Sequence, residues 1–423
     1  MKPATTKASI GVVLASTAMW AVSMGTAQAQ VPSLTHTVVM SGLESPWDMA
    51  FLDDGTMFFT EKCRGLSVRL PSGEVKPLLG MVRSSGFDNI AYDLFCEGQA
   101  GMMGVAVDPD FADNRRIYVM STSSLTAPAS NRVIRLEVSE DLASVSNRTD
   151  IVTDIPYKPA ASNHPFGGPG AHNGGRIRFH DGHLYVTTGD THNGVVPQSP
   201  SLLGGKVLRI DTDGNAAPGN GAPDGFDARI FTYGHRNVQG IAFDPASGAV
   251  VIAEHGPWHS DEVTVLKPGG NGGWDPRPNI GGRGDCPDNY CGYSPNQMDG
   301  MDPAARAAFM PMTDTATYPD AMPPAWVNDG LSQGTGSAAF LVGEQWGDWN
   351  GHMAVGIMGI GFGGTPVGQR IDLLDIADDG LSAEVVSLPL PMEPGRFRSV
   401  VLGPDGSLYA AMDEGEIYQI IPN

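Results

Sequence analysis

The chain has 423 residues, with 26 lysines and arginines against 47 aspartates and glutamates, and its formal net charge is −21 at pH 7. So acidic a protein repels nucleic acid and anionic membrane surfaces, and it accepts a neutral substrate more easily than a polyanion. Glycine (55 residues) and proline (33 residues) are abundant, which is typical of a chain built from short elements and many turns rather than long helices.

In chain order, the first element is a predicted secretory signal peptide over residues 1–29. Two early lysines make its start positive, an apolar run follows from Ile10, and Ala27-Gln28-Ala29 is a small-residue cleavage motif. The apolar run is too short for a stable membrane anchor, and no later stretch approaches membrane-spanning length. We therefore expect a mature chain of residues 30–423 in the periplasm or outside the cell.

The mature chain then repeats a pattern of two short apolar strands joined by an Asp-Gly, Asp-Pro or similar turn. The six units are WDMAFLDDGTMFFTE from Trp47, MMGVAVDPDFADNRRIYVMS from Met102, GGRIRFHDGHLYVTTGD from Gly174, VQGIAFDPASGAVVIAEHG from Val238, GSAAFLVGEQWGDWNGHMAVGIM from Gly336 and RSVVLGPDGSLYAAMDEGEIYQI from Arg398. Repetition on this scale predicts an all-β fold, a six-bladed β-propeller of four-stranded antiparallel blades. We expect one domain over residues 30–423, with loop insertions on one face, the longest at 267–335.

The four cysteines are an even number, and in an exported chain they favour disulfides over a metal site. Cys286 and Cys291 are near enough in sequence to close a small local loop. Cys63 and Cys96 would then pair across a longer one. Three pairings are formally possible, and the spacing favours these two bonds without excluding the others.

Polar residues gather where the repeating units begin, namely Gln99, His172, Arg236, Asn237, Arg396 and Arg398. If the units are blades, equivalent positions converge on the central channel, and these side chains become neighbours. Together they could hold a planar anion and place a general base, His172, beside it. The alternative is that each residue only braces its own blade.

A second candidate site lies in AEHGPWHSDEV, residues 253–263. The backbone carbonyls of Gly256 and Pro257, together with Asp261, are hard oxygen ligands of the kind that Ca²⁺ prefers. The spacing is not that of an EF-hand, and acidic turns without a metal are commoner. Further along, Trp346 and Trp349 could either stack on a sugar or pack in the core between blades.

Seven collinear segments resemble the soluble PQQ-dependent glucose and aldose sugar dehydrogenases, which are quinoproteins that use pyrroloquinoline quinone (PQQ) and Ca²⁺. The segments are GLESPWDMAFLDDG, GQAGMMGVAVDPDF, HNGGRIRF with LYVTTGD, LLGGKVLRIDTDG, YGHRNVQGIAFDP, EHGPWHSDEVTVLKPGGNGGW and RFRSVVLGPDGSLY. The resemblance runs from about residue 43 to residue 420. It implies a six-bladed propeller that oxidises an aldose at C1 to the lactone, with hydride transfer to the quinone.

The resemblance also implies a role for each candidate residue. His172 matches the base that takes the proton from the anomeric hydroxyl, and Arg236 matches the arginine that polarises the quinone carbonyl. The remaining positions match cofactor contacts (Gln99 and Asn237), the pair that binds the cofactor carboxylates (Arg396 and Arg398), carbonyl ligands of Ca²⁺ (Gly256 and Pro257) and a carboxylate that supports the calcium site (Asp261). The resemblance implies a sugar substrate. Because the chain has no CxxCH haem motif, we expect the electrons to leave to an external acceptor. We expect a monomer or a homodimer.

The chain departs from that family at several positions. Ala171 stands where an acidic residue precedes the base, Gly272 where an aromatic is usual, and Thr191-His192 where a substrate-side glutamine is usual. A lysine that contacts the cofactor is expected near Gly359, yet GIMGIGFGG contains none. Two alternatives therefore stay open: a propeller that oxidises a different alcohol or aldehyde, and a non-catalytic, PQQ-free binding propeller.

Overall fold

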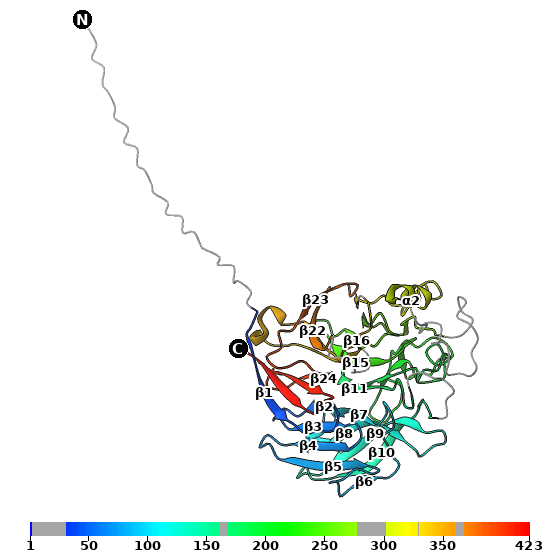
Figure 1. Ribbon diagram of the computed structural model, residues 1–423, viewed down its shortest axis with the longest axis vertical. Helices are drawn as coiled ribbons and strands as arrows, with labels where there is room; N and C mark the ends of the chain where they lie inside the picture. Colours follow the sequence, from blue (N-terminus) through cyan, green and yellow to red (C-terminus); the bar gives the residue numbers. More distant parts are fainter. Residues whose placement is uncertain (2–30, 161–167, 277–301, 329, 361–367) are drawn as a thin grey trace.

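The computed structural model describes the chain except for residues 2–30, 161–167, 277–301, 329 and 361–367. The described residues form six β-sheets around a central axis (Figure 1), and the innermost strand of each sheet contacts the innermost strand of the next. The predicted six-bladed β-propeller is thereby confirmed. The apolar run and cleavage motif of the predicted signal peptide, and the predicted Cys286–Cys291 pairing, lie outside the described residues.

Each blade has four antiparallel strands. From the axis outward, the first blade has β2 (Pro46–Phe51), β3 (Met57–Glu61), β4 (Gly65–Arg69) and β5 (Val75–Met81), and the second has β7 (Met102–Val107), β8 (Arg116–Ser123), β9 (Ser130–Val138) and β10 (Val145–Ile155). The third has β11 (Gly174–His180), β12 (His183–Thr188), β13 (Lys206–Ile210) and β14 (Ile230–Tyr233), and the fourth has β15 (Val238–Phe243), β16 (Val250–Glu254), β17 (Glu262–Val265) and β19 (Trp326–Val327). The fifth has β20 (Thr335–Phe340), β21 (Met353–Ile357), β22 (Arg370–Ile376) and β23 (Ala383–Ser387), and the sixth has β24 (Phe397–Leu402), β25 (Leu408–Met412), β26 (Ile417–Pro422) and β1 (Leu34–Met40). The described helical elements are short: α1 (Phe111–Asn114), α2 (Pro303–Phe309) and the 3₁₀ helix η3 (Glu344–Trp349).

The six predicted units begin at the innermost strands, because each unit opens with the apolar strand that faces its neighbours on both sides. Two features go beyond the prediction. The short strands β6 (Ile90–Ala91) and β18 (Gly270–Asn271) add a parallel fifth strand to two blades. The strand β1 pairs with β26, so residues from the two ends of the chain complete one blade (Figure 1). Most of β1 is exposed.

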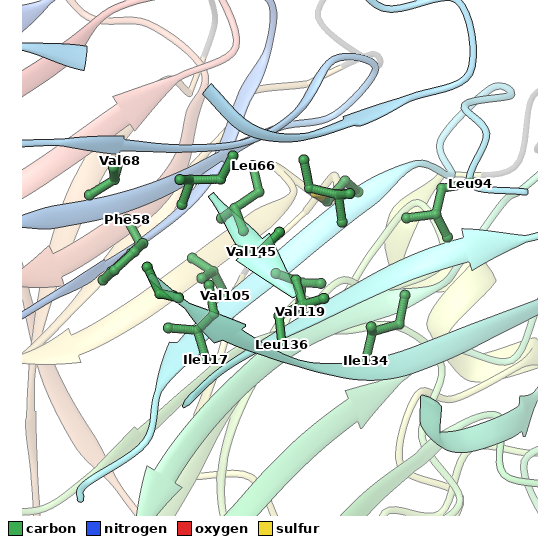
Figure 2. Close-up of a cluster of buried hydrophobic side chains, with 14 of the residues drawn as sticks. Phe58, Leu66, Val68, Leu94, Val105, Ile117, Val119, Ile134, Leu136 and Val145 are labelled. Atoms are coloured by element: carbon green, nitrogen blue, oxygen red, sulfur yellow. The ribbon is translucent and has the colours of Figure 1, made fainter. Parts of the chain in front are cut away.

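Apolar side chains of neighbouring blades meet in clusters between the sheets. In the cluster of Figure 2, Phe58 and Leu66 from one blade pack with Val105 and Ile117 from the next. Truncating a fully buried leucine, isoleucine or phenylalanine to alanine costs about 2–5 kcal/mol of stability. Packing between blades therefore contributes to holding the ring together.

Trp346 and Trp349 belong to another of these clusters and are 0% and 5% exposed. They pack against the core between blades, so the sugar-stacking interpretation of these two residues is wrong. Burial of the indole rings is the stronger demand, because each removes a large apolar area from water.

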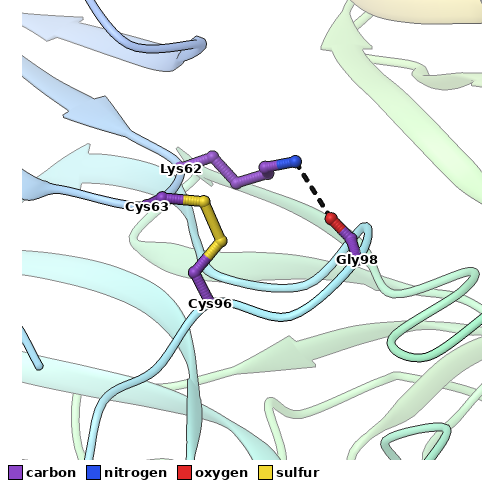
Figure 3. The surroundings of a disulfide bond; sticks show 4 residues. All are labelled: Lys62, Cys63, Cys96 and Gly98. Carbon is purple, nitrogen blue, oxygen red and sulfur yellow. Dashed lines mark hydrogen bonds between the residues drawn. A yellow bond between two sulfur atoms is a disulfide. The ribbon is translucent and has the colours of Figure 1, made fainter. Parts of the chain in front are cut away.

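A disulfide joins Cys63 and Cys96, as predicted, with their Cα atoms 5.1 Å apart (Figure 3). Cys63 lies in the turn between β3 and β4, whereas Cys96 lies in the loop that leads to β7. The bond therefore links two neighbouring blades at the end of the propeller where β7 begins.

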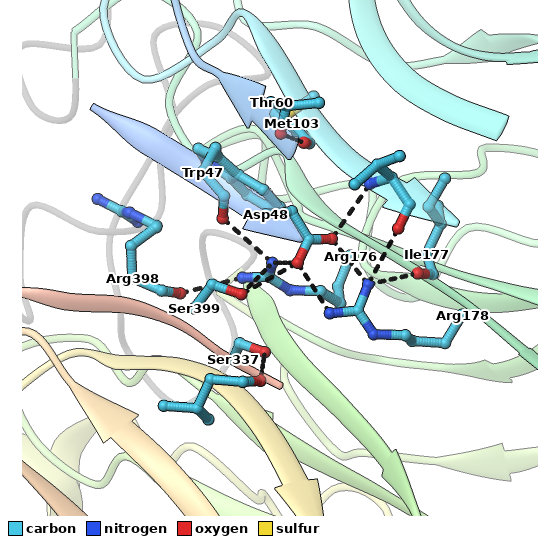
Figure 4. A network of polar contacts seen from close by, with 12 residues as sticks. Trp47, Asp48, Thr60, Met103, Arg176, Ile177, Arg178, Ser337, Arg398 and Ser399 are labelled. Carbon is cyan, nitrogen blue, oxygen red and sulfur yellow. Dashed lines mark hydrogen bonds and ion pairs between the residues drawn. The ribbon is translucent and has the colours of Figure 1, made fainter. Parts of the chain in front are cut away.

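A polar network fills the axis (Figure 4). Arg176, wholly buried on β11, forms an ion pair with Asp48 and donates hydrogen bonds to carbonyl oxygens on β2 and β15 and to Arg398 just inside β24. Arg178 forms a bidentate pair with Asp48 at 2.7 and 2.8 Å. Burial by itself raises the pKa of Asp48, but the two guanidinium groups hold it below its usual value. Since the Val105 backbone on β7 also bonds to Asp48 and Arg178, one charged cluster joins five inner strands.

Candidate functional site

A cavity of about 300 Å³ lies where the innermost strands begin. The inner strands of a propeller run in one direction along the axis, so residues at their starts meet at the same end. Seven of the predicted residues line this cavity: Gln99, His172, Arg236, Asn237, Gly256, Arg396 and Arg398. The predicted convergence is thus observed. Pro257 and Asp261 are not among the lining residues.

His172 is held by a buried carboxylate. Its Nδ1 atom lies 2.8 Å from Oδ1 of Asp190, a residue that is 0% exposed. The other oxygen of Asp190 accepts a hydrogen bond of 2.8 Å from the indole nitrogen of Trp274. An ionised carboxylate can only accept, so the proton of a neutral imidazole resides on Nδ1 and its Nε2 atom presents a lone pair. This is the tautomer that a general base requires.

Two further side chains approach that lone pair. Nε2 of His192 lies 2.8 Å from Nε2 of His172, and Nη2 of Arg236 lies 3.1 Å from the same atom. Because His172 Nε2 is the acceptor, both neighbours must act as donors in this arrangement. The atom that would take a substrate proton therefore sits at the meeting point of three side chains from separate segments.

The backbone around this cluster is strained. His172, Thr191 and His192 have φ between 52° and 56°, a region that L-residues other than glycine rarely adopt. Gly189 allows the two segments to touch, since a Cβ atom there would lie 2.2 Å from the carbonyl oxygen of His172. Non-glycine residues with positive φ cost of order 1 kcal/mol each and cluster at functional sites.

The adjacent Arg236-Asn237 pair is fixed by main-chain and side-chain bonds. Glu254 accepts hydrogen bonds from the backbone nitrogens of both residues. Arg236 donates to the carbonyl oxygen of His255 at 2.6 Å, and Asn237 Oδ1 accepts from the Gly174 nitrogen at 3.0 Å. These contacts position the Arg236 guanidinium at the cavity wall before any ligand binds.

Arg396 and Arg398 share one carboxylate. Asp413 accepts from Arg396 at 3.0 Å and from Arg398 at 2.9 and 2.7 Å. Although burial alone raises the pKa of Asp413, these arginines hold it below its usual value. A second carboxylate, that of Glu414, accepts from the Arg396 backbone nitrogen and also acts on Arg398, but neither carboxylate lines the cavity, so the two guanidinium groups face it.

The cavity is cationic within an acidic protein. Among the described residues, four cationic side chains and no carboxylate line it; the cations are Lys62, Arg236, Arg396 and Arg398. Burial, with the nearby arginines, lowers the pKa of His255 to about 3, so this ring is neutral. A site with this lining is suited to a planar anion with several carboxylates.

The predicted calcium segment forms a tight loop on the wall. Gly256 lines the cavity, while Asp261 lies wholly buried behind the loop. The two carboxylate oxygens of Asp261 accept hydrogen bonds from the Gly256 nitrogen, the Ser332 hydroxyl and two further backbone nitrogens. Since those bonds occupy the carboxylate, any cation here would take its oxygens from backbone carbonyls and from a ligand.

Sequence reasoning assigned no role to four lining or supporting residues: Lys62, Asp190, Trp258 and Trp274. Asp190 comes two residues after the end of β12, at the same end of the propeller as His172. Its position just after a strand was the feature of the sequence that could have identified it as a site residue. Lys62 and Trp258 lie in loops, and the sequence does not indicate whether those loops face the cavity. At Gly272 a Cβ atom would lie 2.7 Å from the His235 ring, so the space for the expected aromatic is filled.

The chain matches the model of the Glucose / Sorbosone dehydrogenase family over residues 43–419. The aldose sugar dehydrogenase YliI of Escherichia coli (strain K12) is 27% identical over 421 residues, which cover 98% of this chain and 97% of that protein. Quinoprotein glucose dehydrogenase B of Acinetobacter calcoaceticus is 28% identical over 297 residues, 63% of this chain and 57% of its own length. The PQQ-bound form of aldose sugar dehydrogenase from Streptomyces coelicolor shares the fold, with a TM-score of 0.65 at 23% identity over 93% of this chain and 100% of the other. The chain therefore belongs to the glucose / sorbosone dehydrogenase family of oxidoreductases.

Proposed function

We propose that this protein oxidises aldose sugars at C1 to the lactone, with PQQ as hydride acceptor, Ca²⁺ as its companion ion and His172 as general base. The observation that carries the proposal is the pairing of a base with an anion site. His172, oriented by Asp190, opens into a cavity lined by four cations and no carboxylate among the described residues. The cofactor is a planar anion with three carboxylates, and this lining fits it.

In this proposal the residues of the chain bind, orient and move a proton. Arg396, Arg398 and Asn237 hold the cofactor, and Gln99, whose Oε1 atom accepts from the backbone nitrogen of His172 at 3.4 Å, lies next to the base. His172 Nε2 takes the proton of the anomeric hydroxyl, and Asp190 stabilises the resulting imidazolium. Arg236 supplies positive charge where negative charge develops. PQQ, when bound, would supply the acceptor for the hydride that leaves C1.

The calcium part of the proposal rests on backbone oxygens. The carbonyls of Gly256 and Pro257 would hold the ion, and Asp261 would fix the loop that presents them through its bonds to the backbone. Carbonyl and cofactor oxygens are suitable ligands for so hard a cation. The ion would offset part of the negative charge of the cofactor.

We also propose a periplasmic or secreted location and a separate electron acceptor. The Cys63–Cys96 disulfide is typical of oxidising compartments. Among the helices of the described residues, none is long and apolar enough to cross a bilayer. A monomer or homodimer stays a prediction.

A different alcohol or aldehyde as substrate is the second candidate. It is favoured by His192, which lies against the base at the place where the resemblance leads one to expect a glutamine. A non-catalytic binding propeller has less support, because Trp346 and Trp349 are buried and a base with an oriented proton serves no need in a binding module.

The test is reconstitution of the purified protein with PQQ and Ca²⁺. We expect stoichiometric binding and bleaching of the quinone absorbance when an aldose is added. His172→Ala should retain cofactor binding but lose at least about 100-fold in turnover, since a positioned base contributes 10²–10⁴-fold. The proposal is wrong if the wild-type protein binds no PQQ in excess Ca²⁺, and the substrate class is wrong if other alcohols reduce the cofactor and aldoses do not.

A further inference from the structure

We propose that Lys62 is a cofactor-binding residue, supplying to the PQQ carboxylates the positive charge that the missing lysine near Gly359 would supply. This inference rests on the proposed function and concerns a residue from a different blade. Lys62 follows β3, whereas Gly359 follows β21, and the blade that contains β24 lies between their two blades. Both residues line the same cavity.

The backbone of Lys62 is anchored to two blades. Its nitrogen donates to the Ser45 carbonyl at 3.1 Å, and its carbonyl oxygen accepts from the Met102 nitrogen at 2.9 Å. The next residue, Cys63, is bonded to Cys96 (Figure 3). A long, flexible side chain thus starts from a rigid point, which reduces the conformational entropy lost when a ligand is bound.

The ammonium group retains capacity for a ligand. In the described part of the chain it donates one hydrogen bond, to the Gly98 carbonyl oxygen at 3.0 Å, and forms no ion pair with a carboxylate. An ammonium has three N–H donors, so two remain for water or for a bound anion. The residue is half-buried, but its bond to Gly98 is exposed, so the ammonium is accessible to a ligand that enters the cavity.

The electrostatic surroundings point the same way. Arg396 and Arg398 share Asp413, and Lys62 lies near enough to both arginines for their charges to act on it. Burial is the largest cause that lowers the pKa of Lys62 below its usual value; Arg398 and Arg396 act in the same direction, whereas Asp413 and Glu44 oppose them. A bound polycarboxylate would offset that repulsion, whereas the wall at Met358 and Gly359 offers no charge of its own.

The experiment is a titration of the full-length mature protein with PQQ in excess Ca²⁺, followed by tryptophan fluorescence and checked by the thermal midpoint with and without PQQ. Variants are Lys62→Gln, Lys62→Arg and the control Lys76→Gln. Lys76 also donates a single bond to a carbonyl, that of Asp141 at 2.8 Å, but does not line the cavity. Lys62→Met replaces the glutamine variant if the latter does not fold.

We expect Lys62→Gln to raise the Kd for PQQ about 10- to 100-fold, because a hydrogen bond to a charged group contributes roughly 1.5–3 kcal/mol. Lys62→Arg and Lys76→Gln should stay within about 3-fold of the wild type. The inference is overturned if the wild-type protein binds PQQ and Lys62→Gln binds it with the same Kd. A wild type that binds no PQQ overturns both this inference and the proposed function, so the two failures are distinguishable.

Discussion

The Nε2 atoms of His172 and His192 lie 2.8 Å apart, and their rings meet edge to face with centroids 3.9 Å apart. With the His172 proton held on Nδ1 by Asp190, His192 donates its own Nε2 proton into the lone pair of the base. A substrate hydroxyl needs the same lone pair. Substrate binding must therefore displace the donors at this atom, of which His192 is nearer than Arg236.

Replacing His192 by alanine should ease substrate binding. Loss of the competing donor lowers KM for the aldose by up to about 10-fold, the equivalent of one hydrogen bond, with kcat nearly unchanged. Steady-state kinetics with a dye acceptor measure both constants. His183→Ala, which changes a histidine outside the cavity, serves as the control. A rise in KM together with a fall in kcat would show that His192 orients the sugar instead.

Replacing Asp190 by asparagine should lower kcat by about 10²–10⁴-fold. The amide can donate to Nδ1 of His172, which moves the imidazole proton to Nε2 and removes the lone pair of the base. It also removes the charge that stabilises the imidazolium. PQQ titration should give a Kd near the wild-type value, since Asp190 does not line the cavity. Turnover within about 3-fold of the wild type would contradict this role.

Replacing Asp48 by asparagine should destabilise the propeller by about 3–5 kcal/mol, because Arg176 is left buried without its partner. The pKa of Asp48 is lowered in the folded state. Its stabilisation is thus complete above the unfolded-state pKa of about 4 and is lost as the pH falls through the folded-state value.

Denaturant unfolding of the wild type between pH 3 and pH 7 should accordingly show stability falling below about pH 4, with a smaller fall in Asp48→Asn. Asp378→Asn is the matched control, because Asp378 is exposed. Parallel curves for the wild type and Asp48→Asn at acid pH would exclude this ion pair as a source of acid sensitivity.

Removing the Cys63–Cys96 disulfide by serine substitution at both positions should cost about 3–4 kcal/mol, as expected for a loop closed across a sequence separation of 33. Because the bond adjoins Lys62 and the loop that carries Gln99, PQQ affinity should also fall. Urea unfolding and PQQ titration measure the two effects. Unchanged affinity in a destabilised variant would separate the disulfide from the cofactor site.

Local sequence determined much of this protein. Short apolar strands with Asp-Gly turns specify hairpins through backbone conformations that few other residues allow, as at Gly182 and Gly406, where φ is 72° and 76°. Repetition of those hairpins predicted the six blades. The positions of His172, Arg236 and Arg398 at the starts of blades predicted their convergence, since a propeller brings equivalent positions together.

Tertiary structure decided what local pattern could not. Nothing near Trp346 in the sequence tells whether its ring meets a sugar or the next blade. Asp190 contacts His172, and Lys62 lines the same cavity as Arg398. Both contacts depend on the spacing of the blades around the axis and on the path of the loops between strands. Hydrophobic periodicity reports which face of a strand is buried, whereas the partners of a polar side chain depend on distances between segments far apart in the chain.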